Sequence, residues 1–156
     1  GAMATGCTAE INWAKVDYLE IKNSWDMAEA YRQNAKTLGR DFFPLDMIPT
    51  NAAGSTDMGN VSHRVPSIHP MIACAPPEVV IHNPEFAHYA GSETGDLAVL
   101  EGAKSMAITA LDFMTDADLR QKAKDSFNET GDTSKMSVKS AWREEGVAHL
   151  GGCGCS

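Results

Sequence analysis

Long hydrophobic runs and clusters of positive charge are both missing from this sequence. The longest apolar run is only a few residues, whereas a membrane-spanning helix needs about 20. No charged start followed by a hydrophobic stretch marks a signal peptide. With 13 Lys and Arg against 21 Asp and Glu, the formal net charge is −8. Nucleic acid and anionic membranes are therefore not expected as partners.

Cysteine is also scarce. Cys7 and Cys74 stand alone, and Cys153 and Cys155 form a C-x-C near the end of the sequence. This pattern is not a disulfide framework, and two thiols do not by themselves make a metal site. A reducing, cytoplasmic setting is the expectation.

The rest of the composition is that of a globular protein. The chain has 156 residues, of which 43% are hydrophobic and 22% charged, which is enough for one domain with a core. Alternating residues predict a short strand over 8–13. Asn23 or Ser24 can cap the start of a helix that Gly39 should stop. Its expected buried face consists of Met27, Ala28, Tyr31, Ala35 and Leu38.

The second half alternates between apolar runs and helical patterns. The runs 71–75 and 79–81 suit buried strands. Asn83 should cap a helix that begins at Pro84. A long helix follows over 94–114, and Thr115 with Asp118 resembles a capping box for another. The long helix should bury a stripe of Leu97, Leu100, Ala103, Ala107, Ala110, Leu111 and Met114, and the last helix Leu119, Ala123 and Phe127.

Among the five histidines, His82 has the most suggestive position. It follows a predicted strand and precedes a predicted helix, and ligands in open α/β sheets bind at the carboxyl ends of strands. A neutral imidazole there is a natural zinc ligand. Spacing alone leaves open that His82 caps the helix. Glu85 could orient His82 from behind, or simply sit on the positive helix end.

The second candidate site is the segment 54–60, which begins Gly54-Ser55-Thr56-Asp57. Its backbone N–H groups and hydroxyls could hold a carboxylate or a carbonyl oxygen. The alternative is that Ser55 or Thr56 caps a short turn beginning at Asp57.

These motifs, in this order, resemble metallopeptidase family M-twenty. The match comprises the segment 54–62, then Val65-Pro66, His69-Pro70 and His82-Asn83-Pro84-Glu85-Phe86. It is similar to the C-terminal catalytic segment of the aminoacylase, aminobenzoyl-glutamate hydrolase and dipeptidase-like branch. The segment 4–11 resembles the end of that branch's lid domain. The resemblance covers roughly residues 4 to 127.

The resemblance implies a fold and a chemistry. The fold class is α/β: a sheet with covering helices, forming the C-terminal part of a zinc-exopeptidase-like catalytic domain, preceded by the last strand of a lid or dimerisation domain. Two metal ions, usually zinc with manganese or cobalt as substitutes, activate a water that attacks an amide carbonyl. His82 is then the final metal ligand, Gly54, Ser55 and Thr56 contact substrate, and Asp57 and Glu85 act from the second shell.

The family's other metal ligands and its catalytic base have no counterpart here. The chain is therefore expected to be an inactive part of a homo-oligomeric amidohydrolase, with no catalytic residue of its own, that cleaves N-acyl amino acids or dipeptides. The rest of the enzyme, on the same chain or another, is its expected partner. Residues 1–22 should end the lid domain, 23–130 belong to the catalytic domain, and 131–156 form a loosely ordered tail. The alternative is a non-catalytic fragment that binds a carboxylate ligand or serves assembly.

Overall fold

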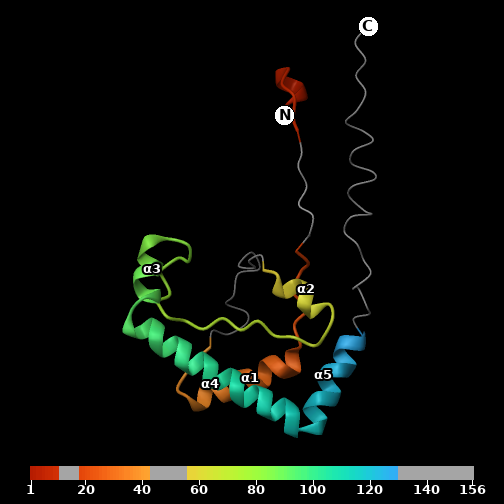
Figure 1. The fold of residues 1–156 in the computed structure, drawn as a ribbon, viewed down its shortest axis with the longest axis vertical. Coiled ribbons are helices and arrows are strands. Elements are labelled where there is room, and N and C mark those ends of the chain that lie inside the picture. The colour runs from red at the N-terminus through yellow and green to blue at the C-terminus, as the bar shows by residue number, and fades with distance from the viewer. Residues whose placement is uncertain (11–17, 43–55, 130–156) are drawn as a thin grey trace.

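The computed structural model describes residues 1–10, 18–42 and 56–129, and its elements there are helical (Figure 1). No strand forms within these ranges; an isolated parallel bridge joins Asn23 to Ser67. None of the helices described is long and apolar enough to cross a membrane. The elements are η1 Met3–Thr5, α1 Trp25–Thr37, α2 Met58–Ser62, α3 Pro84–Ala90, α4 Glu93–Thr115 and α5 Ala117–Glu129.

Helix α1 confirms the first predicted helix. Asp26 lies in its first turn, where a carboxylate suits the positive helix end. Gly39 stops the helix in a left-handed conformation with φ of 84°, and its N–H donates to the Lys36 carbonyl oxygen. Tyr31 and Ala35 are buried, as predicted. Ser24 occupies the N-cap position, but its hydroxyl makes no capping hydrogen bond.

Helix α4 forms where it was predicted, but a different face of the helix is buried. The predicted inward residues are largely exposed: Leu97, Leu100, Leu111 and Met114 are 50%, 57%, 54% and 66% accessible. The buried positions are instead the small residues Gly95, Ala98, Ser105 and Thr109.

The inward face of α4 is narrow because α1 packs closely against it. The two helices run antiparallel, since residues near the start of α1 approach the end of α4 and Arg40 approaches Glu101. Asn34 joins them by donating to Thr109 Oγ1 at 3.1 Å and to Asp112 Oδ2 at 2.7 Å. Thr109 in turn donates to the Ser105 carbonyl oxygen, so its buried hydroxyl is satisfied within the helix. Small side chains allow this approach, and large ones are directed outward.

Helix α5 confirms the last predicted helix but corrects its cap. The Asp116 carboxylate accepts from the N–H groups of Asp118 at 2.8 Å and Leu119 at 3.1 Å. Thr115 still belongs to α4, where its hydroxyl donates to the Leu111 carbonyl oxygen. The predicted Thr115 capping box is therefore wrong. Ala123 is buried, as predicted.

The strands predicted at 71–75 and 79–81 are not present. This stretch is non-helical and runs along α4 between α2 and α3 (Figure 1). Arg40 donates to the Ala73 carbonyl oxygen at 2.8 Å, and Thr94 donates to that of Cys74 at 2.9 Å. These side chains take the place of a neighbouring strand, which the described residues do not supply. Met71 is 74% exposed, so the run is not buried either.

The predicted fold is therefore supported only in part. The helices stand, whereas the α/β sheet, like the domain boundaries, stays a prediction. Of the strand predicted over 8–13, residues 8–10 are not in a strand, and 11–13 lie outside the described residues. The tail predicted over 131–156 lies outside them as well.

Candidate functional site

His82 lies on a turn directly before α3. Its backbone is left-handed with φ of 66°, the only non-glycine residue of the described part in that region. Such a conformation costs an L-residue about 1–2 kcal/mol, and residues held this way cluster at functional sites. The imidazole is exposed, and no residue of the described ranges hydrogen-bonds it. The side chain is therefore open to a ligand from outside this part of the chain.

The residues before His82 differ from the prediction. It does not follow a buried strand, because Val80 is 67% and Ile81 47% exposed. It does precede a helix, and Asn83 caps that helix by accepting from the Phe86 N–H at 2.9 Å. The alternative in which His82 itself caps α3 is therefore wrong.

Glu85 lies in the first turn of α3, where a carboxylate suits the helix dipole. No hydrogen bond joins it to His82 in the part of the chain that the structure describes. The helix-dipole interpretation needs no further contact, while a role behind His82 stays a prediction.

The Gly54–Asn60 segment lies only partly within the described residues. Gly54 and Ser55 fall outside them. The Thr56 hydroxyl accepts weakly from the Met58 N–H at 3.3 Å, so it is engaged at the start of α2. Asp57 is exposed beside it. This favours the alternative in which Thr56 stabilises a local turn. Contact between Thr56 and a substrate stays a prediction.

Asn60, Ser62 and His63, which follow Gly59, bind another segment of the chain in a way that the sequence pattern did not predict. Asn60 Oδ1 accepts from the Leu19 N–H at 2.8 Å, and Ser62 Oγ accepts from the Lys22 N–H at 2.9 Å. His63 Nε2 lies 3.0 Å from the Glu20 carbonyl oxygen. We call Asn60, Ser62 and His63 the α2 anchor. It binds a segment about 40 residues earlier, so no local pattern could have indicated it.

The structure thus separates two kinds of histidine. His63 is 3% exposed and is used to hold the 19–22 segment. His82 is exposed on a strained turn at the opposite end of the 64–82 segment. Figure 1 places α2 and α3 apart, so the described part of the 54–60 segment, at α2, lies away from the turn that precedes α3. His149 lies outside the described residues.

The described residues do not make a metal site by themselves. Residues 1–10, 18–42 and 56–129 contain no group of three or more His, Cys, Asp or Glu side chains able to hold a metal ion. A catalytic zinc site needs about three protein ligands. His82 fits the role of one ligand, and the others would have to come from elsewhere.

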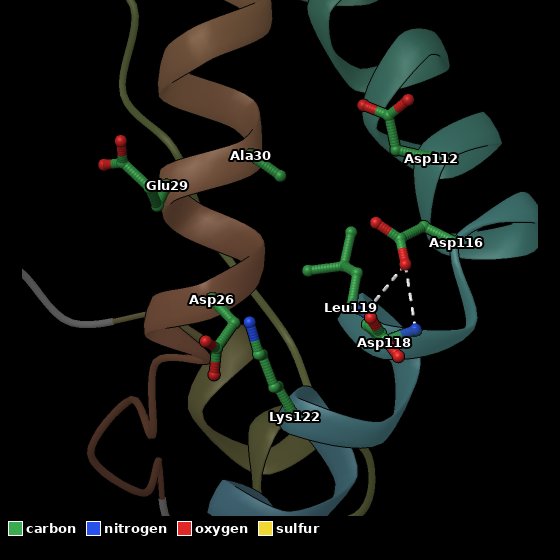
Figure 2. A pocket seen from close by; sticks show the side chains of 8 residues that line it. All are labelled: Asp26, Glu29, Ala30, Asp112, Asp116, Asp118, Leu119 and Lys122. Atoms are coloured by element: carbon green, nitrogen blue, oxygen red, sulfur yellow. Dashed lines mark hydrogen bonds between the residues drawn. The ribbon is translucent and has the colours of Figure 1, made fainter.

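An acidic hollow in the described part of the chain has a structural explanation. It has a volume of about 430 Å³ and is bordered by α1, α4 and α5 (Figure 2). Asp112 accepts from Asn34, and Asp116 caps α5. Asp26 and Asp118 lie in the first turns of their helices, where carboxylates are stabilised. The carboxylates here therefore lie at helix starts or accept hydrogen bonds from side chains and backbone of the same chain, as Glu29 does from Arg32.

A second hollow of about 510 Å³ lies between α4 and the 73–76 segment. Its charged side chains, Arg40 and Glu101, form an ion pair. Arg40 and Thr94 also hold the backbone of the segment, as described above. The polar groups of this hollow are therefore used to hold the chain together.

Comparison with known proteins finds relatives for most of this chain. No protein-family model matches the chain. The curated proteins it is similar to are dipeptidases. It is 39% identical to the Xaa-Arg dipeptidase of Mus musculus over 111 residues, which are 71% of this chain and 26% of that protein. It is 34% identical to the Xaa-Arg dipeptidase of Homo sapiens over 126 residues, 81% of this chain and 29% of that protein.

This similarity supports the relation to dipeptidases that the motifs predicted. The chain spans between a quarter and a third of the length of the curated relatives it matches.

Proposed function

We propose that this chain is part of a metal-dependent amidohydrolase that cleaves the amide bond of dipeptides or N-acyl amino acids. The observation that carries the proposal is the similarity to two Xaa-Arg dipeptidases over 71% and 81% of the chain. Dipeptides ending in arginine are the first substrates to test, because both relatives are named for them. The expected homo-oligomer and cytoplasmic setting belong to this proposal.

The residue proposed to serve the chemistry is His82. An exposed neutral imidazole can donate a nitrogen lone pair to a metal ion. Zinc, or manganese or cobalt in its place, would supply the activation of water at neutral pH. The left-handed turn fixes where the imidazole is presented, and the Asn83 cap fixes the helix behind it. Gly54, Ser55 and Thr56 are proposed to contact the substrate, with Asp57 and Glu85 in supporting positions.

The chain alone is proposed to be inactive, since its described residues hold no complete ligand set. The test is a chimera of the mouse Xaa-Arg dipeptidase in which this chain replaces the stretch it matches. Hydrolysis of an Xaa-Arg dipeptide, abolished by a chelator and restored by zinc, supports the proposal. A folded, metal-loaded chimera without turnover contradicts it. So does stoichiometric tight zinc binding with turnover by residues 1–156 alone, because the chain would then be a complete small enzyme.

A further inference from the structure

Helix α4 directs small residues inward and large apolar side chains outward. Inward, it packs on α1, α3 and α5. Outward, it presents Leu97, Leu100, Leu111 and Met114, each at least half exposed. The apolar face of an amphipathic helix is normally the face that is buried. At 23 residues it is also about 35 Å long, which is long for an exposed apolar element.

The charged residues of α4 also lie mainly on its inward side. Between Leu97 and Met114 the helix has three charged residues. Glu101 pairs with Arg40, and Asp112 accepts from Asn34, so both are directed toward α1 and its C-terminal end. Lys104 is the remaining charge and is exposed. The polar groups of α4 are thus mostly inside and its large apolar groups outside, which is the reverse of a helix that faces water.

We infer that the outward face of α4, defined by Leu97, Leu100, Leu111 and Met114, is an interface for an apolar layer supplied by the rest of a dipeptidase-length polypeptide. This inference rests on the proposed function. The chain corresponds to 26–29% of its relatives, so most of their length has no counterpart here. Several large apolar side chains exposed along one side of a helix indicate an interaction site. The described residues contain no layer that could cover it.

The test uses the mouse relative with its matched stretch deleted, tagged, and co-expressed with residues 1–156. We expect the chain to be retained on the tagged polypeptide in a one-to-one ratio. The variant Leu100→Glu with Leu111→Glu should be retained at least tenfold less. A matched control, Ala117→Glu with Asn128→Glu, adds the same charge at exposed positions of α5 and should be retained like the unmodified chain. Circular dichroism should show equal helix content in all three, because every substituted side chain is exposed.

Equal retention of all three forms overturns the inference, and so does retention of none. Sedimentation of the chain alone provides a further check. A dimer that Leu100→Glu with Leu111→Glu converts to monomer would assign this face to a second copy, which also overturns it. Dipeptide hydrolysis is measured separately on each co-purified complex. Retention without turnover leaves the interface standing and contradicts the proposed function, so the two failures can be told apart.

Discussion

Gly59 lies so close to Leu19 that a Cβ atom on Gly59 would overlap the Leu19 carbonyl oxygen. No Cβ atom tolerates a contact this short, and the obstacle is backbone rather than a flexible side chain. Gly59, near the end of the 54–60 segment, therefore has a packing role. It lets α2 approach the 19–22 segment closely enough for the α2 anchor to form its hydrogen bonds.

Gly59→Ala should therefore destabilise the chain. Overpacking costs about 1–3 kcal/mol, and here the lost anchor hydrogen bonds of Asn60 and Ser62 would add to that cost. Urea unfolding followed by circular dichroism measures the change. The control is Gly102→Ala in α4, where the new Cβ would meet Ile72 Cδ1 at an ordinary 3.6 Å. This control should gain up to about 1 kcal/mol from helix propensity. Equal effects at both positions would contradict the close approach.

The cap of α5 provides a second prediction. Asp116→Ala removes the acceptor of the Asp118 and Leu119 N–H groups, and loss of an N-cap costs about 0.5–2 kcal/mol. Thr115→Ala should cost less, because Thr115 bonds back within α4. Thermal or urea unfolding of both variants decides the matter. A larger loss for Thr115→Ala would restore the capping box expected from the sequence.

Local signals in the sequence predicted the helices well. The ends of α1 and the cap of α3 depend on residues within one turn of each other, such as Asn83 and Phe86. Such contacts are visible in sequence because both partners lie in the same short window.

Non-local features could not be predicted in this way. Periodicity predicted the position of α4, but which face is buried depends on the element that packs beside it. Asn34 of α1 binds the face that carries Thr109 and Asp112, so that face is the buried one. A strand at 71–75 needs a partner strand, which the described residues do not supply. The α2 anchor joins Asn60 to Leu19 across 41 residues. His82 is predicted as a site residue because a strand is expected before it, and that strand is not present. Its left-handed backbone has no signal in the local sequence.

Acid should reveal the ion pair on the exposed side of α1. Glu29 accepts from Arg32 and Gln33, and these hydrogen bonds, Arg32 first, lower the pKa of Glu29 from 4.5 to about 2. Because the folded pKa lies below the unfolded one, the stabilisation is fully present above 4.5 and is lost as the pH falls toward 2. The urea midpoints of the unmodified chain and Glu29→Gln should differ slightly at neutral pH, since the pair is exposed. The difference should shrink only below about pH 4.5. A difference already gone at higher pH would contradict the lowered pKa.

The strained turn at His82 allows function and stability to be separated. In the chimera, His82→Ala and His82→Gly both remove the proposed metal ligand. Loss of a residue that merely orients a ligand costs about 10–100-fold, so loss of the ligand itself should lower dipeptide hydrolysis by at least about 100-fold. Metal content, measured by mass spectrometry of the purified chimera, should fall with it.

The two variants should differ in stability. Glycine adopts φ near 66° without the Cβ penalty that histidine and alanine carry. In residues 1–156, His82→Gly should therefore match or exceed the unmodified stability, by up to about 1 kcal/mol, whereas His82→Ala should leave it nearly unchanged, because the imidazole makes no hydrogen bond to the described residues. His88→Ala, which removes another exposed histidine from the same helix region, should keep full activity. Loss of stability in both His82 variants with activity spared would assign this histidine to the turn alone and remove it from the proposed metal site.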